Sequence, residues 1–212
     1  MKLLSSVRIV IMLTGMTMLF AGVVAYAAKH QIGEEYGGGI VCYVDSTGEH
    51  GLIAAKQDIN TIYTEQYHGK SYKRTGYYKW STAELKKRPN EVECVYSIRY
   101  HPVNNTSTAL GQGLANTIKF LAKNPAKIYP NTAAAVAHGY HGGDYDDWYL
   151  PSKDELNQLY IHRDLIGGFS PYHYWSSSEF ATQAAWYQNF GDGSQTVYFK
   201  YKCCRVRTIR DF

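Results

Sequence analysis

The order of sequence patterns along this 212-residue chain predicts an α+β fold with a mainly antiparallel sheet. Strand-like runs lie near both ends of the chain, and helix-like runs lie between them. Short turn signals separate neighbouring strand-like runs, which is typical of antiparallel hairpins. No internal repeat, low-complexity linker or long charge block divides the chain. We therefore expect one domain in which helices flank the sheet.

Residues 1–27 are typical of a secretory signal peptide. Lys2 and Arg8 precede a long apolar run that ends in small residues. We predict cleavage before Ala28, which leaves residues 28–212 as a single exported domain in the periplasm, at the outer membrane or outside the cell. The alternative is an uncleaved membrane anchor, because the apolar run is about 20 residues long, as a membrane span requires.

The composition excludes one class of partner and favours another. The net charge is +4, and removal of the two cations of the signal peptide leaves only +2, so the total charge predicts no polyanion partner, and we expect no nucleic acid. Tyrosine is unusually abundant, with 20 residues against 7 Phe. A tyrosine ring combines a rigid face with a hydroxyl group, which suits both a half-buried core and a glycan-binding surface.

Strand-like runs appear in three parts of the mature chain. The sequence GGGIVCYVDSTGEHGLIAA at 37–55 predicts a hairpin with a turn at 46–48. Residues 60–105 are polar and aromatic, and we expect them to be irregular. From Tyr174 onward, YWSSSEF, AAWYQNF, the turn GDG and TVYFKYKCCRVRTIR predict strands and turns.

Three helices are expected in the middle. Apolar residues recur at helical spacing over 107–123, and a short helix is expected at 131–137. A third helix is expected from Ser152 to about His162. Ser152 and Glu155 have the spacing of a capping box, in which each side chain binds the backbone N–H of the other residue.

The four cysteines are Cys42, Cys94, Cys203 and Cys204. Because export permits disulfides, we predict that Cys42 or Cys94 pairs with Cys203 or Cys204. A zinc site is the rival interpretation, but the chain has no C-x-x-C motif and no histidine at ligand spacing from these thiols. We expect no metal and no cofactor.

Several motifs together resemble a known family. GGGIVCYVDSTGEHGLIAA, GLANTIKFLA, DDWYLPSKDELNQLY, YWSSSEF, AWYQNFGDG and CRVRTIRDF occur in this order over residues 33–212. The chain is therefore similar to a family of bacterial secreted domains that includes the C-terminal domain of the Legionella collagen-like adhesin. The resemblance implies a C-type-lectin-like fold with paired first and last strands, and binding of sulfated glycosaminoglycans by a trimer. The chain lacks the collagen-like G-x-y repeat, so nothing in it enforces a homo-oligomer.

The resemblance gives the DDWYLP motif a structural role at the junction of helices and sheet. Trp148 and Leu150 are expected to face inward, and Asp146 and Asp147 are expected to accept backbone N–H bonds. The alternative is that these two acids, with Asp144, hold calcium.

We expect no enzymatic activity. The neighbouring thiols of Cys203 and Cys204 lack a positioned base, and no histidine lies in a recognised catalytic motif. The serines at 176–178 do not form a G-x-S-x-G elbow, so their hydroxyl groups are expected to satisfy backbone groups at the end of a strand.

The predicted binding site is a basic segment with interleaved aromatic rings between positions 67 and 88. Rings stack on sugar faces, and Lys and Arg bind sulfate or carboxylate groups. The predicted ligand-binding residues are Lys70, Lys73, Arg74, Tyr77, Tyr78, Trp80, Lys86, Lys87 and Arg88. The alternative is a solvated loop whose rings partly enter the core.

Two functions are consistent with these features. The first is an adhesin-like module that binds acidic or sulfated polysaccharide. The second is a structural subunit of a periplasmic or outer-membrane assembly, such as a secretion system, which would use the same aromatic residues to bind envelope proteins.

Overall fold

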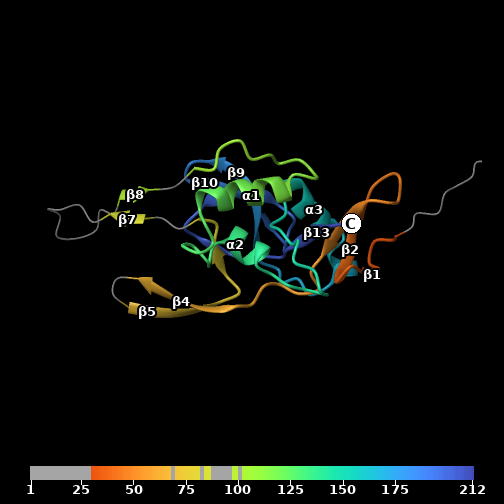
Figure 1. Ribbon diagram of the computed structural model, residues 1–212, viewed down its shortest axis with the longest axis horizontal. Coiled ribbons are helices and arrows are strands. Elements are labelled where there is room, and N and C mark those ends of the chain that lie inside the picture. Colours follow the sequence, from red (N-terminus) through yellow and green to blue (C-terminus); the bar gives the residue numbers. More distant parts are fainter. Residues whose placement is uncertain (1–29, 68–69, 82–83, 87–96, 100–101) are drawn as a thin grey trace, which may run out of the picture.

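The computed structural model describes residues 30–67, 70–81, 84–86, 97–99 and 102–212. The strands are β1 (Glu35–Tyr36), β2 (Gly39–Val44), β3 (Gly51–Ala54), β4 (Ile62–Tyr67), β5 (Lys70–Thr75), β6 (Tyr78–Lys79), β7 (Glu84–Lys86), β8 (Ser97–Arg99), β9 (His173–Ala181), β10 (Ala184–Asn189), β11 (Gln195–Phe199), β12 (Cys203–Cys204) and β13 (Ile209–Asp211). The helices are α1 (Gly113–Lys123), α2 (Ala133–His138), α3 (Lys153–Ile161) and α4 (Arg163–Ile166). Helices and antiparallel strand pairs confirm the α+β class (Figure 1).

Strands from both ends of the described chain form the first sheet, in the order β1-β2-β3-β13. β13 pairs with β3 through Ile209 opposite Ala54 and Asp211 opposite Leu52. The last strand therefore shares a sheet with the first strand, as expected, but its direct neighbour is β3. In Figure 1 this sheet lies at one end of the molecule, and the hairpin β4–β5 lies at the other end.

Two tight turns shape the first sheet. Gly37 and Gly38 join β1 to β2 with φ angles of 51° and 84°, which a two-residue hairpin turn requires and glycine adopts easily. Between β2 and β3, the Asp45 carboxylate accepts hydrogen bonds from the backbone N–H groups of Thr47 (2.9 Å) and Gly48 (3.0 Å). The hairpin predicted for residues 37–55 is confirmed.

The second sheet has the order β11-β10-β9. The long strand-like run at the end of the chain does not continue past Phe199, because the Lys202 N–H bonds to the Phe199 carbonyl (2.9 Å) and closes a turn. Beyond this turn, β12 pairs with β6, and β13 joins the first sheet.

α3 has the capping box that the sequence predicts. The Ser152 hydroxyl accepts a hydrogen bond from the Glu155 N–H (3.2 Å), and the Glu155 carboxylate accepts one from the Ser152 N–H (2.6 Å). Leu156 and Leu159 on this helix are fully buried. The local pattern therefore fixes both the start of α3 and its inward face.

α1 begins at Gly113, six residues later than predicted. The preceding residues make tertiary contacts instead, as when the Thr108 carbonyl accepts the Asp154 N–H (2.9 Å), and Gly111 has a φ of 77° that interrupts a helix. The exposed side of α1 carries Leu114 (39% exposed) and Ile118 (48%). Its buried residues are Gly113, Asn116, Thr117 and Phe120.

The described part of residues 60–105 contains regular structure, which corrects the expected irregular segment. β4 and β5 form an antiparallel hairpin from Ile62 opposite Thr75 to Tyr67 opposite Lys70. Because both strands are largely polar, each lacked the apolar alternation that marks a half-buried strand.

Trp148 is fully buried, which confirms its expected inward position. Its indole N–H donates to the Tyr145 carbonyl (3.2 Å), and the Tyr140 ring meets the indole edge to face. Asp147 does not hold the loop through backbone bonds as expected. Its carboxylate binds the Arg210 guanidinium at 2.6 and 2.8 Å, and these bonds lower the pKa of the Asp147 carboxyl.

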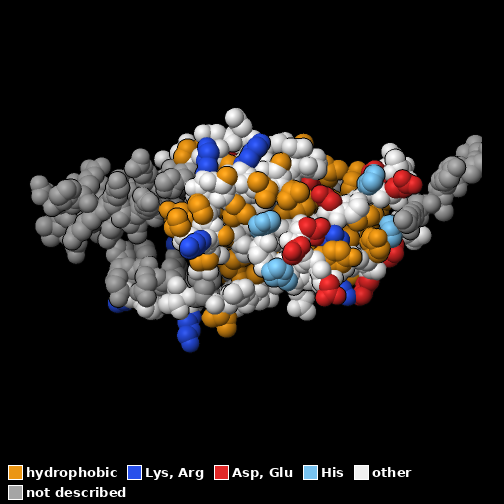
Figure 2. Space-filling view, in the orientation of Figure 1, with side chains coloured by type: hydrophobic (Ala, Val, Ile, Leu, Met, Phe, Trp, Pro, Cys, Tyr) orange, Lys and Arg blue, Asp and Glu red, His pale blue; other side chains and the backbone are white. Residues whose placement is uncertain are grey.

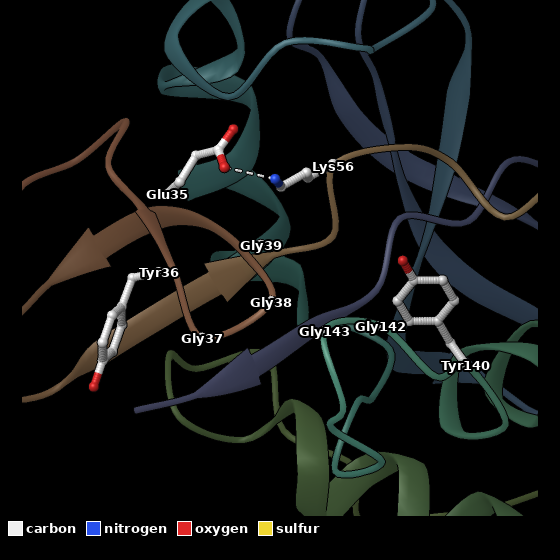
Figure 3. A pocket seen from close by; sticks show the side chains of 9 residues that line it. All are labelled: Glu35, Tyr36, Gly37, Gly38, Gly39, Lys56, Tyr140, Gly142 and Gly143. Carbon is white, nitrogen blue, oxygen red and sulfur yellow. Dashed lines mark hydrogen bonds and ion pairs between the residues drawn. The ribbon is translucent and has the colours of Figure 1, made fainter.

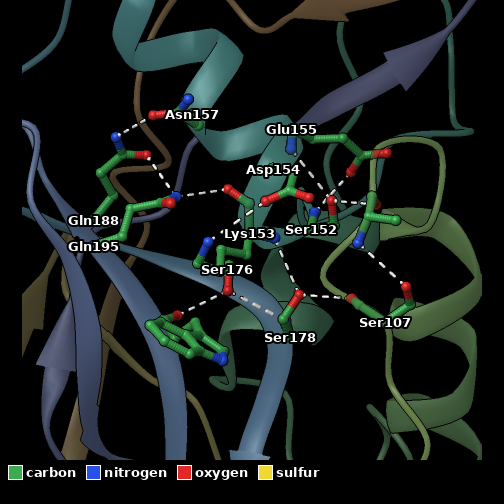
Figure 4. A network of polar contacts seen from close by, with 12 residues as sticks. Ser107, Ser152, Lys153, Asp154, Glu155, Asn157, Ser176, Ser178, Gln188 and Gln195 are labelled. Carbon is green, nitrogen blue, oxygen red and sulfur yellow. Dashed lines mark hydrogen bonds and ion pairs between the residues drawn. The ribbon is translucent and has the colours of Figure 1, made fainter.

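The serines of β9 satisfy backbone groups, as expected (Figure 4). The Ser176 hydroxyl donates to the Trp186 carbonyl (2.8 Å), and the Ser178 hydroxyl donates to the Ser107 carbonyl (2.7 Å). The Ser178 hydroxyl also accepts the Lys153 N–H (3.0 Å), so these side chains link β9 to the start of α3.

No disulfide is present among the described residues, so the predicted bond is not formed between Cys42 and Cys204. Cys42 is buried beside Leu52, whose carbonyl accepts the thiol hydrogen bond (3.2 Å), whereas Cys204 is buried in a different core cluster. A bond that involves Cys94 lies outside the described residues.

Candidate functional site

The basic segment predicted to bind ligand is divided by the fold. Its first part forms β5 and β6, and Lys86 lies in β7. Lys70 and Lys73 are exposed, but their odd spacing places them on opposite faces of β5. The backbones of Arg74 and Lys86 are described without their side chains. Lys87 and Arg88 lie outside the described residues.

Tyr78 and Trp80 are core residues rather than surface residues, which corrects the predicted site. Tyr78 is fully buried and its hydroxyl accepts the Thr61 N–H (2.9 Å). Trp80 is 2% exposed, and its indole N–H donates to the Ser176 carbonyl (2.7 Å). Neither ring is available to a sugar, so the alternative that rings enter the core holds for these two residues.

Tyr77 is neither fully buried nor fully exposed, and its ring faces Arg205. The Arg205 guanidinium lies 4.8 Å from the centre of the Tyr77 ring and 5.5 Å from that of Tyr172. Tyr172 is 53% exposed. A guanidinium held near two rings presents positive charge within an aromatic surface.

The charge at Arg205 is not balanced by its surroundings. The buried Asp58 carboxylate binds Arg205 (3.1 Å) and also Arg207 (2.9 Å), and it accepts the Tyr174 hydroxyl hydrogen bond (2.7 Å). Two cations therefore share one anion. Arg207 is fully buried and donates to the carbonyls of three further residues, Ala55, Gly167 and Gly168. The surplus positive charge reaches solvent through Arg205, whose side chain is 18% exposed and whose buried Nε has no hydrogen-bond partner.

Further rings extend this surface along the second sheet. His173 follows Tyr172, and its exposed ring lies 4.8 Å from the Tyr187 ring. The Tyr187 ring lies 5.6 Å from the Tyr198 ring, and both tyrosines are half-buried. We call these two neighbouring groups together the aromatic tract; it consists of Tyr77, Tyr172 and Arg205, followed by His173, Tyr187 and Tyr198.

A second concave region is lined largely by glycines (Figure 3). This cleft of about 460 Å³ lies between the β1–β2 turn and the loop at 140–143. A Cβ on Gly38 would lie 2.6 Å from the Gly142 carbonyl oxygen, so the close approach of the two loops explains the glycines. Lys56 on its rim is paired with Glu35 (2.7 Å), so this lysine offers no surplus charge to an anion.

Two features of the described residues bear on the nucleophilic and calcium alternatives. Burial raises the pKa of both the Cys42 and Cys204 thiols, which opposes formation of the reactive thiolate. Within the described ranges, no three His, Cys, Asp or Glu side chains are grouped to hold a metal ion, and the proposed calcium ligand Asp147 is instead bound to Arg210.

Sequence reasoning missed most of the aromatic tract. Arg205 and Asp58 are 147 positions apart, and no local motif connects them. The surplus of tyrosine was the available signal, but it does not show which rings lie side by side.

Comparison with known proteins identifies one family. A sequence model of the Lcl C-terminal domain family matches residues 114–210. A fimbrial protein from Bacteroides ovatus aligns with a TM-score of 0.43 and 15% sequence identity, over 81% of this chain and 43% of that protein. The chain thus spans less than half of that protein's length, and no curated protein matches. The resemblance inferred from the motifs is confirmed over residues 114–210, which match the Lcl C-terminal domain family.

Proposed function

We propose that this protein is an exported, non-enzymatic binding module that recognises acidic or sulfated glycans through the aromatic tract. The observation that carries the proposal is Arg205, which presents surplus positive charge between the rings of Tyr77 and Tyr172. Such rings stack on the faces of sugars, and a guanidinium binds sulfate or carboxylate through parallel hydrogen bonds.

The distribution of charge supports this location. In the view of Figure 2, Asp and Glu side chains gather toward the end that holds β1 and β2. An anionic ligand is repelled from that end and attracted to the cations elsewhere. Exposed Lys70 and Lys73 on the projecting hairpin add to this attraction.

The export route and the finer fold are parts of the same proposal. Residues 1–27 act as a cleaved signal peptide, and residues 28–212 form the single exported domain. The predicted signal peptide lies outside the described residues, and among the described helices none is long and apolar enough to span a membrane. A C-type-lectin-like arrangement is supported by the sheet that β13 shares with β1.

Binding to immobilised heparin tests the function. Wild-type protein should bind at low salt and elute as salt rises, because the screening length falls from about 10 Å at 0.1 M to about 3 Å at 1 M. Arg205→Met should weaken binding at least tenfold. The matched control is Arg163→Met, because Arg163 also lies over a tyrosine ring, that of Tyr160 at 4.3 Å, but lacks the second cation beside it.

A wild-type protein that does not bind heparin at low salt would contradict the proposed function. Equal losses in the Arg205 and Arg163 variants would show that total charge, rather than the aromatic tract, controls binding.

The second candidate, a structural subunit of an envelope assembly, is favoured by the exposed apolar side of α1. Figure 2 shows hydrophobic side chains gathered over this helix, where Leu114 and Ile118 are exposed. Size-exclusion chromatography of a detergent-solubilised envelope separates the two functions, because a stoichiometric large complex is expected only for the subunit.

A further inference from the structure

A second aromatic surface lies on the other side of the sheet that carries the aromatic tract. Side chains alternate between the two faces of a strand. Ala185 and Tyr187 of β10 are on the face that packs against the core. Trp186 therefore faces outward, opposite Val197 of β11. Phe199, two residues further along β11, faces the same way.

Four rings share this outer side. The Phe180 and Trp186 rings meet edge to face at 5.5 Å, and the Phe199 and Tyr201 rings stack at 5.7 Å. Phe180 is 59% exposed and Phe199 is 48% exposed. We call these four residues the outer aromatic face. Rings with this much exposure are free to stack on another flat group.

α3 covers only one end of this side of the sheet. The Gln195 side chain donates to the Lys153 carbonyl (2.8 Å), and the Gln188 side chain donates to the Asn157 side chain (2.9 Å), as Figure 4 shows. Trp186 lies next to this covered end, where the Lys153 ammonium group is 5.1 Å from its ring centre. Phe180 and Phe199 lie beyond the helix.

A polar hollow of about 550 Å³ adjoins Phe180. Its polar lining residues are Asn104, Asn105, Thr106, Thr182 and Glu179, and the charge of Glu179 is balanced by Lys200. Side-chain amides and hydroxyl groups both donate and accept hydrogen bonds, as the hydroxyl groups of a sugar require. An apolar ring beside a polar hollow is the combination that binds a sugar, which has an apolar face and a polar rim.

A lysine lies over one ring of each aromatic pair. Lys202 lies over Tyr201 at 5.2 Å. Lys153 lies over Trp186 but is also paired with the Asp154 carboxylate at 3.5 Å, so the surplus charge comes from Lys202. Lysine is depleted in the core of protein interfaces, whereas it complements the acid groups of a polysaccharide. Lys202 beside exposed rings therefore favours an acidic glycan over a second copy of the chain or another protein.

We infer that the outer aromatic face is a second binding site for an acidic polysaccharide, with Phe180 and the adjoining hollow holding one sugar unit. The inference rests on the proposed function, because it assigns the same class of ligand to a separate surface. With sites on both faces of one sheet, a single domain bridges two polysaccharide chains.

Titration calorimetry with a size-fractionated heparin hexasaccharide tests the inference. Wild-type protein should bind two molecules per chain. The double variant Phe180→Ser/Phe199→Ser should bind one, with an unchanged melting temperature, because both rings are largely exposed. Arg205→Met should also bind one, now at the outer face. The control Ile161→Ser changes a residue that is 54% exposed elsewhere and should leave two sites.

The outcomes separate the two proposals. One wild-type site that is lost in Arg205→Met and kept in the double Phe variant overturns the second site but supports the aromatic tract. One wild-type site that is lost only in the double Phe variant supports the outer aromatic face and overturns binding at the aromatic tract. No binding overturns both. A wild-type oligomer that the double Phe variant converts to monomer, measured by sedimentation, overturns the inference because the face is then a protein interface.

Discussion

Two buried charge clusters in this protein are built from the same groups but differ in balance. Lys200 is fully buried and pairs with the nearly buried Glu179, one cation to one anion. Asp58 is shared by Arg205 and Arg207, two cations to one anion. In the balanced cluster, Glu179 also accepts the backbone N–H groups of Val103 and Asn104. The unbalanced cluster opens to solvent at the aromatic tract. The ratio of cations to anions therefore distinguishes the two clusters: equal numbers hold a loop in place, whereas an extra cation is available to a ligand.

The largest expected effect is in the balanced cluster. Glu179→Gln leaves the Lys200 ammonium group buried without a carboxylate, which should destabilise the domain by about 3–5 kcal/mol. The loss should shrink at alkaline pH, since burial already lowers the pKa of Lys200 and the neutral amine is tolerated. Denaturant unfolding measures both effects. The double variant Glu179→Leu/Lys200→Met should recover most of the stability. A Glu179→Gln protein with the same free energy of unfolding as wild type would show that the ion pair does not stabilise the fold.

A smaller effect is expected from Glu155, a buried carboxyl without a cation beside it. Burial raises its pKa from 4.5 to about 6 in the folded protein. The folded state therefore binds this proton more tightly than the unfolded state does. The contribution is fully present below pH 4.5 and is lost as pH rises through 6, a change of about 2 kcal/mol.

Unfolding curves of wild type and Glu155→Gln across this pH range measure that change. Glutamine keeps an oxygen that accepts the Ser152 N–H and does not titrate, so the difference in stability between the two proteins should vary with pH. A constant difference would contradict the raised pKa.

The smallest effect on stability is expected for Arg205→Met. Asp58 keeps its bonds to Arg207 and Tyr174, so the free energy of unfolding should fall by about 1 kcal/mol or less. Thermal melts check this value. A loss as large as that of Glu179→Gln would mean that Arg205 supports the core, and the contrast between the clusters would disappear.

The sequence predicted features that depend on neighbouring residues. The capping box of Ser152 and Glu155 spans four positions, so local geometry decides it. The buried position of Trp148 also followed from its motif. By contrast, α1 starts late because Thr108 bonds to Asp154, a contact that helical spacing does not encode.

Of the residues in the aromatic tract, the sequence predicted only Tyr77 as a binding residue. This residue stacks on Arg205, whereas Tyr78 and Trp80 in the same short segment enter the core. The alternation of β6 decides between these positions, and that strand is defined by its pairing with β12 far along the chain. The position of Asp58 depends on similar long-range contacts with Arg205 and Arg207.

The pairing of β13 with β3 has a consequence for how the domain forms. Ile209 meets Ala54, and Thr208 accepts the Ala55 N–H through its carbonyl (3.0 Å), so the first sheet stays incomplete until residues 208–211 have been synthesised. Contacts between such distant positions slow folding, because a long loop must close before any of them stabilises the chain. The nascent chain therefore cannot complete this sheet while the ribosome adds the residues between β3 and β13, and β3 keeps an unpaired edge until β13 emerges.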